Sequence, residues 1–301
     1  SAFVRAAGGG LRFGLAARRA LLTVARIKHW TPGFAARYPI GLRGYRAPFI
    51  EAHTSQAAAL CYDFIHPLLT PDERLEVERA LFEKGVLWLD AYLRQHGEGY
   101  LLKSNQGAVY ALGLLYAAQV SRRSVPEAAR AAERWGGGLL RMLGSYYKAD
   151  GSTDEGMMYW EYTTHYAAEA LLLLSRAAGR EPAEIAPPGF AASIEYVMHL
   201  RSLASGELRF LPIGDCREEE FRYLGPSLLF YSKMFRDTRA LWLWRRHYAR
   251  PHPPGSTFFG HPEGTGQYTS NGLLTLLLLP EEGTEAPAPR LQGSKLFHVT
   301  E

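Results

Sequence analysis

The sequence predicts an all-α protein in which successive helices pack as antiparallel hairpins. Apolar residues recur at helical spacing through most of the 301 residues, whereas alternating strand patterns are nearly absent until the end of the chain. Short Gly- and Pro-containing loops separate roughly nine such segments. Hydrophobic residues make up 47% of the chain, which is sufficient for a buried core. This pattern fits an α/α toroid and a helical bundle equally well.

The clearest helix start is Thr70-Pro71-Asp72-Glu73. Thr70 can cap the first turn, proline fits the first helical position, and Glu73 can bond back to the amide of the cap residue. The apolar pattern then continues as far as Gly97, which predicts the end of this helix.

The same start pattern occurs twice more. Ser124-Val125-Pro126-Glu127 predicts a helix that runs to about Tyr147. Ser152-Thr153-Asp154-Glu155 predicts a third capping box, for a helix that ends near Gly179. Further helices are predicted at about 15–29, 51–66, 106–121, 190–205, 226–249 and 268–279.

The end of the chain has a different composition. Residues 281–292 are rich in Pro, Glu and Gly and are predicted to form a linker. Residues 295–300 (KLFHVT) have the composition of a strand. We therefore expect a helical domain over 1–280, and a linker with the first strand of a following β-rich domain over 281–301.

Composition and charge exclude several classes of function. Lys and Arg (34) exceed Asp and Glu (30) by four without long basic blocks, so no nucleic acid partner is expected, whereas a polyanionic substrate is compatible. No apolar run reaches about 18 residues, so no membrane span is expected. No metal-binding, Walker A or nucleophile-elbow motif occurs. Cys61 and Cys216 could pair or remain separate thiols.

Asn105 and Gln106 stand where an apolar helix begins, directly after Lys103 and Ser104. Amide side chains and free N–H groups at a helix start can hold an anion such as a carboxylate. The alternative is that Ser104 or Asn105 only caps the helix.

Tyr159, Tyr162 and Tyr166 follow the spacing i, i+3, i+7 and share one helix face, with His165 beside Tyr162. Aromatic rings with hydroxyl groups suit a sugar-binding cleft. The alternative is an aromatic stripe in the core.

Three further residues are candidates for the same cleft. Glu155 could line it or complete the capping box, and Asp215 could line it or form a turn with Gly214. His53, near a helix start, could contact a ligand or be structural.

Taken together, these segments resemble the heparinase II/III-like family of polysaccharide lyases. The resemblance covers most of the chain, in the family's order. It rests on YPIGLRGYRAPFIEAHTSQAAALCYDFIHPLLTPDER (38–74), KSNQGAVYALG (103–113), YYKADGSTDEGMMYWEY (146–162) and LPIGDC (211–216).

The resemblance implies an incomplete α/α toroid followed by a β-sandwich, with cleavage of uronic-acid polysaccharides such as heparan sulfate or alginate by β-elimination. It implies an anionic polysaccharide or oligosaccharide as substrate and no cofactor in this chain. Some relatives hold a zinc ion in the β-sandwich, which would follow Glu301. Polymer-degrading relatives are often periplasmic or secreted, with a cytoplasmic location as the alternative. The sequence predicts no oligomeric state.

The resemblance also implies roles for particular residues. Asn105 matches the asparagine that neutralises the uronate carboxylate, and Tyr162 matches the catalytic tyrosine, with Tyr159 as the alternative register. Gln106 stands where several alginate-active relatives have histidine. Substrate contacts are expected from Gln106, Tyr159, Glu155, His53, Tyr166, His165 and Asp215.

Two other functions remain as alternatives. A glycoside hydrolase would use two carboxylates, which Asp150, Asp154, Glu155 and Asp215 could supply. A non-catalytic glycan-binding domain would bind without turnover. A lyase product carries a C4–C5 double bond, whereas hydrolysis adds water, so the product distinguishes the two reactions.

Overall fold

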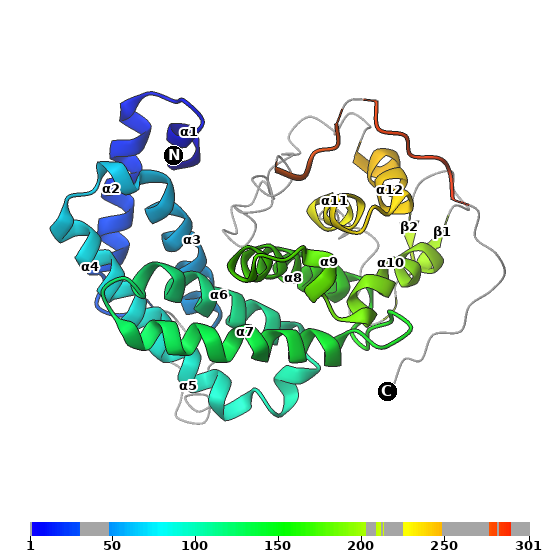
Figure 1. The fold of residues 1–301 in the computed structure, drawn as a ribbon, viewed down its shortest axis with the longest axis horizontal. Coiled ribbons are helices and arrows are strands. Elements are labelled where there is room, and N and C mark those ends of the chain that lie inside the picture. Colours follow the sequence, from blue (N-terminus) through cyan, green and yellow to red (C-terminus); the bar gives the residue numbers. More distant parts are fainter. Residues whose placement is uncertain are drawn as a thin grey trace. The chain divides into compact units, whose positions relative to one another are not determined.

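The computed structural model describes residues 2–30, 48–202, 209–211, 213, 225–248, 277–281 and 283–289. The described part is mostly helical, which confirms the all-α prediction (Figure 1). The chain divides into two compact units. The first unit comprises Ser1–Leu101 and Val109–Leu139, and the second comprises Leu102–Ala108 and Leu140–Glu301. The toroidal arrangement of the helices stays a prediction.

The first unit contains the helices of the N-terminal part of the chain. They are α1 (Ala2–Ala6), α2 (Leu11–Arg26), α3 (Phe49–Ile65), α4 (Pro71–Leu81), α5 (Leu87–His96), most of α6 (Asn105–Ser121) and the first part of α7 (Pro126–Tyr146). Short 3₁₀ turns lie at His66–Leu68 and Tyr100–Leu102, and the latter ends at the unit boundary.

The helix predicted from the Thr70 start is present. The Glu73 amide donates to Thr70 Oγ1 at 3.3 Å and the Thr70 amide donates to Glu73 Oε2 at 3.0 Å, so the predicted capping box is confirmed. The helix is not uniform, because a π-helical turn at Phe82–Val86 joins α4 to α5. It ends at His96, where the Gly97 amide donates to the Leu93 carbonyl at 2.7 Å.

Small residues allow α3 and α6 to approach closely within the first unit. A Cβ atom added at Gly113 of α6 would lie 2.6 Å from Ala52 Cα on α3. A Cβ atom added at Gly85, in the π-helical turn, would lie 2.4 Å from Ser55 Oγ on α3. No larger residue fits these positions without moving backbone or neighbouring side chains.

The second unit contains the remaining elements. They are the last turns of α7, then α8 (Gly156–Ala178), α9 (Pro182–Ile185), α10 (Pro188–Leu200), β1 (Arg201–Ser202), β2 (Arg209–Phe210), α11 (Gly225–Met234) and α12 (Thr238–Tyr248). β1 and β2 form a two-residue antiparallel pair in which Arg201 lies opposite Phe210. The helix predicted at 190–205 therefore ends earlier than expected, at Leu200.

The single helix predicted at 226–249 is two helices. Arg236 adopts a positive φ of 55°, which ends α11. Asp237 then accepts hydrogen bonds from the amides of Arg239 (2.9 Å) and Ala240 (3.3 Å), which caps α12. The break follows from this cap, which hydrophobic periodicity does not reveal.

A buried hydrogen-bonded chain connects three helices of the second unit. Trp160 Nε1 on α8 donates to Ser193 Oγ on α10 at 2.9 Å, and Ser193 Oγ lies 2.7 Å from Tyr231 Oη on α11. Tyr231 Oη donates to the Phe190 carbonyl at 2.7 Å. Because Trp160 is fully buried, these bonds fix the rotation of α8 about its own axis.

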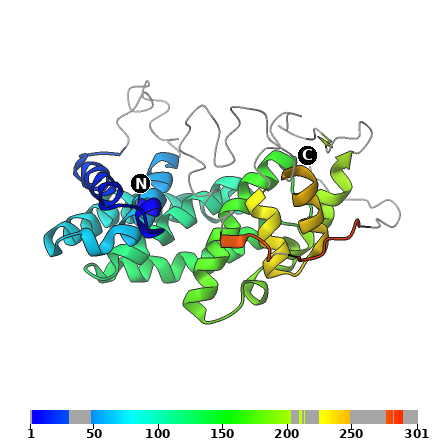
Figure 2. The same ribbon diagram turned by 90° about the horizontal axis from the view of Figure 1, so that it is seen from above.

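The described C-terminal residues run along α11 and α12 (Figure 2). Lys233 Nζ on α11 donates to the Leu277 carbonyl at 3.0 Å. The predicted strand at 295–300, Cys216 and most of the predicted helix at 268–279 lie outside the described residues. Among the helices that are described, none combines the length and the apolar character needed to cross a membrane.

Candidate functional site

The start of α6 is capped by Ser104. The Gln106 amide donates to Ser104 Oγ at 3.2 Å, and the Gly107 amide donates to the Ser104 carbonyl at 3.1 Å. Ser104 therefore takes the capping position, and the side chain of Asn105 is left for another role. Gln106 is half-buried at the second helical position.

Asn105 binds a carboxylate, which belongs to Glu155. Asn105 Nδ2 lies 3.0 Å from Glu155 Oε1 and 3.1 Å from Oε2, and the Asn105 backbone amide donates to Oε2 at 3.0 Å. Asn105 is 6% exposed. An anion at the first turn of a helix is stabilised by the unpaired N–H groups and by the helix dipole. In this structure the Asn105 donors therefore hold the carboxylate of Glu155.

The capping box predicted at Ser152–Glu155 is wrong. α8 begins at Gly156, and the Glu155 side chain makes no capping bond to it. Ser152 instead donates from its amide (2.9 Å) and its hydroxyl (2.7 Å) to Asp150 Oδ1, which forms a tight turn. The physical reason is that this local turn and the bonds to Asn105 use both side chains that the box required.

Two tyrosines that were predicted as site residues lie half-buried on α8. Tyr159 and Tyr162 are three residues apart and share one face of α8, which begins directly after Glu155. Because Trp160 points into the core, Tyr159 and Tyr162 are turned away from it.

Burial raises the pKa of Tyr162 to about 12, with a hydrogen bond from Tyr166 acting in the opposite direction and the neighbouring Tyr159 adding to the rise. The two rings of Tyr162 and Tyr166 are T-shaped, with centroids 4.9 Å apart. At neutral pH only about one Tyr162 hydroxyl in 10⁵ is ionised, so this residue is a proton donor in its resting state.

Tyr146, the last residue of α7, is a neighbour of Glu155 that sequence reasoning missed. It is 4% exposed, and its hydroxyl has no hydrogen-bond partner. Burial raises its pKa well above the usual value, and the negative charge of Glu155 adds to the rise. A contact with the buried Thr163 hydroxyl acts in the opposite direction and lowers this pKa. The only signal in the sequence was the Tyr146-Tyr147 pair before the Asp150 turn, which does not separate a core pair from a site.

The other residues predicted to contact the substrate lie in different parts of the structure. Tyr166 is 1% exposed, and His165 is also buried, with Nε2 3.2 Å from Glu169 Oε1, so both support the Tyr162 face from within the core. His53 lies on α3 in the first unit, where its ring stacks on Phe49 with centroids 6.2 Å apart. Asp215 lies outside the described residues.

The carboxylates that a hydrolase would need are engaged in the turn before α8. Asp150 accepts hydrogen bonds from Ser152, and Asp154 forms an ion pair with Lys148. Glu155 is held by Asn105. No observation on these residues favours a pair of carboxylates across a cleft.

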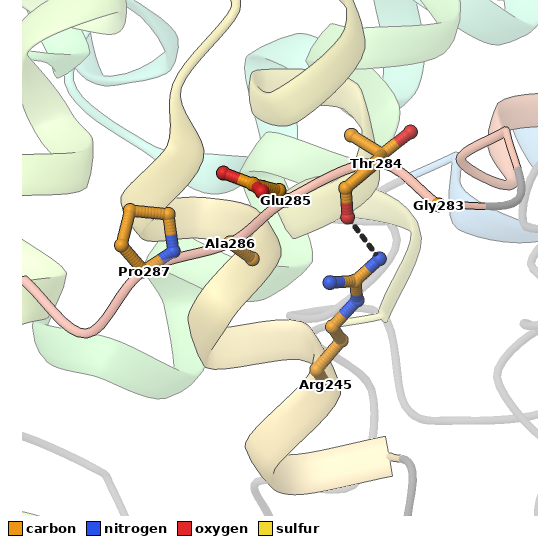
Figure 3. A pocket seen from close by; sticks show the side chains of 6 residues that line it. All are labelled: Arg245, Gly283, Thr284, Glu285, Ala286 and Pro287. Atoms are coloured by element: carbon orange, nitrogen blue, oxygen red, sulfur yellow. Dashed lines mark hydrogen bonds between the residues drawn. The ribbon is translucent and has the colours of Figure 1, made fainter.

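A separate pocket lies on the surface of the second unit, between α12 and the segment 283–287 (Figure 3). Arg245 crosses it, with Nη2 2.5 Å from the Thr284 carbonyl. None of the predicted site residues lines it. Within the described ranges, no group of three or more His, Cys, Asp or Glu side chains is arranged to hold a metal ion.

No protein-family model matches the chain, and none of the curated proteins compared with it is significantly similar. The resemblance to heparinase II/III-like lyases therefore stays a prediction from the sequence motifs.

Proposed function

We propose that the protein cleaves a uronic-acid-containing polysaccharide by β-elimination, with Asn105 binding the uronate carboxylate and Tyr162 transferring a proton. One observation carries this proposal. The side-chain amide and backbone N–H of Asn105 bind a carboxylate, that of Glu155, and Glu155 directly precedes the helix that carries Tyr159 and Tyr162 on one face.

These residue types suit the reaction. The C5 proton of a uronate passes to water, its electron pair forms the C4–C5 double bond, and the C4–O bond breaks with the electrons on the departing oxygen. Amide donors on the carboxylate stabilise the enolate-like charge that develops when C5 loses its proton. Tyr162, which is protonated at neutral pH, supplies the proton to the departing oxygen.

The substrate class follows from the same argument. A sugar with a carboxylate at C5 matches the donors of Asn105, which make its C5 proton more acidic by stabilising the charge that develops, so glycans without such a group do not fit. Heparin, heparan sulfate, hyaluronate, chondroitin and alginate all have such residues. The proposal therefore names uronate polymers as a class, including those related to heparin and alginate.

Incubation of the 301-residue chain with these five polymers tests the proposal through the ultraviolet absorbance of unsaturated uronate. We expect absorbance to rise with at least one polymer. Tyr162→Phe should reduce kcat by about 10² to 10⁴-fold, because it removes the proton donor without changing the ring.

Tyr159→Phe is the matched control, since it removes a hydroxyl one turn away on the same face. A loss with Tyr159→Phe and none with Tyr162→Phe would assign the proton transfer to Tyr159. New reducing ends without the double bond would show hydrolysis and contradict the proposal, as would polymer binding without any cleavage.

A further inference from the structure

The donors that would bind a substrate carboxylate are already occupied. Both oxygens of Glu155 lie within 3.1 Å of Asn105 Nδ2, and the Asn105 backbone amide donates to one of them. A uronate carboxylate brought to the same donors would meet the negative charge of Glu155 at short range, and the two anions would repel each other. Both therefore cannot use Asn105 at once.

A second set of donors lies beside Glu155. The hydroxyls of Tyr146 and Thr163 are buried, at 4% and 1% residue exposure, and neither has a hydrogen-bond partner. The charge of Glu155 and a side-chain contact with it both raise the pKa of Tyr146, and the Thr163 hydroxyl contacts the same group, so the three side chains lie together. Buried donors without partners are unfavourable, so an arrangement that brings a carboxylate to them recovers free energy.

We infer that Glu155 is a resident ligand of the Asn105 carboxylate site, that a uronate carboxylate replaces it there, and that Tyr146 and Thr163 receive the displaced Glu155 side chain. The inference rests on the proposed function for the identity of the incoming ligand. The apparent affinity for the uronate is then reduced in proportion to the fraction of molecules in which Glu155 occupies the site. It also makes the site selective, because only an anion competes with Glu155 for the same donors.

Binding of glucuronate to the whole chain tests the inference without requiring turnover. The dissociation constant is measured from the shifts of the Asn105 backbone and side-chain amide signals in NMR spectra, with glucuronamide as the uncharged match. Glu155→Ala should tighten glucuronate binding by about tenfold, if Glu155 occupies the site about nine-tenths of the time. The affinity for glucuronamide should not increase to a comparable extent in this variant.

Two further variants separate the steps. Glu155→Gln keeps the shape of the side chain and loses its charge. Because charge-assisted hydrogen bonds are about twice as strong as neutral ones, the glutamine should compete less well for the Asn105 donors than Glu155 does. The affinity of this variant for glucuronate should therefore lie between those of Glu155→Ala and the unmodified chain. Tyr146→Phe should weaken glucuronate binding several-fold in the unmodified chain. It should have no effect in the Glu155→Ala background, because there is then no Glu155 side chain for Tyr146 to receive and the two substitutions are not additive. Tyr147→Phe is the control, since that hydroxyl is already paired with Thr164 Oγ1 at 2.7 Å.

Weaker glucuronate binding in both Glu155→Ala and Glu155→Gln, with unchanged thermal unfolding, would overturn the inference and make Glu155 a support for Asn105. An equal effect of Tyr146→Phe in both backgrounds would overturn the part that concerns Tyr146. If glucuronate binds as expected but no polymer yields unsaturated product, the proposed lyase reaction fails while the carboxylate exchange stands.

Discussion

Asn105 shows how much one side chain depends on its partner. Its amide donates to an anion that lies fifty residues further along the chain, and Ser104 takes over the capping role that Asn105 could otherwise have filled. A neutral amide satisfies the half-buried carboxylate of Glu155 without adding charge. An aspartate at position 105 would have nearly the same size as asparagine, but its carboxylate would repel that of Glu155.

We therefore expect Asn105→Asp to destabilise the protein by about 1 to 3 kcal/mol at pH 7, because it removes a donor and places two carboxylates together. The loss should shrink near pH 4, where one of the two carboxyl groups binds a proton. Thermal unfolding at both pH values measures the effect.

Asn105→Ala is the control for this prediction, since it removes the side-chain donor without adding charge. An Asn105→Asp variant that is no less stable than Asn105→Ala at pH 7 would contradict the assigned contact with Glu155.

At the scale of elements, the turn that leads into α8 sets the position of Glu155. Gly151 has a φ of 85° and packs against α10, where an added Cβ atom would lie 2.5 Å from the Ala192 carbonyl oxygen. The backbone conformation and the close approach both exclude a side chain.

Gly151→Ala should cost about 2 kcal/mol or more of the free energy of unfolding, and it should also lower activity because Glu155 shifts with the turn. Gly144→Ala is the matched control. It lies inside α7, where the nearest contact of an added Cβ atom is an ordinary 3.7 Å from Pro187, so this change should be neutral or stabilising by up to about 1 kcal/mol. Denaturant titration compares the two variants.

A second prediction concerns the contact between α2 and α4. Arg18 Nε donates to Glu73 Oε2 at 2.9 Å, and this hydrogen bond lowers the pKa of Glu73, with the Thr70 amide adding to the effect. Because the pKa is lowered in the folded state, the stabilisation is present above the pKa of the unfolded state and is lost as pH falls through the folded value.

Acidification below about pH 4 should therefore weaken the α2–α4 contact, and Glu73→Gln should remove this part of the pH dependence. Stability measured by urea unfolding between about pH 3 and pH 7 provides the test. Glu184→Gln, at an exposed pair with Arg180, is the control for the substitution itself.

At the scale of the whole molecule, the net charge of +4 favours encounter with an anionic polymer. Affinity for heparin should fall by about tenfold when the salt concentration rises from about 0.05 M to about 0.5 M, because salt screens this attraction. Binding of a neutral glucan such as dextran is the control and should stay weak at both concentrations. A heparin affinity independent of salt would contradict an electrostatic contribution to binding.

The sequence by itself determined the helical class, the capped start at Thr70 and the segments that contain Asn105, Tyr159 and Tyr162. Caps and apolar periodicity are local signals, so they are readable over a few turns of chain. Helix breaks set by a single cap, such as the one at Asp237, were not recovered.

Only the tertiary structure decided which groups meet. It assigned Glu155 to Asn105 rather than to a capping box, and it buried Tyr146 beside that carboxylate. The physical reason is that hydrogen-bond partners fifty residues apart are chosen by how helices pack and rotate, here through Trp160 and its bond to Ser193. Local sequence patterns name the residues that could form a site, whereas packing selects the ones that do.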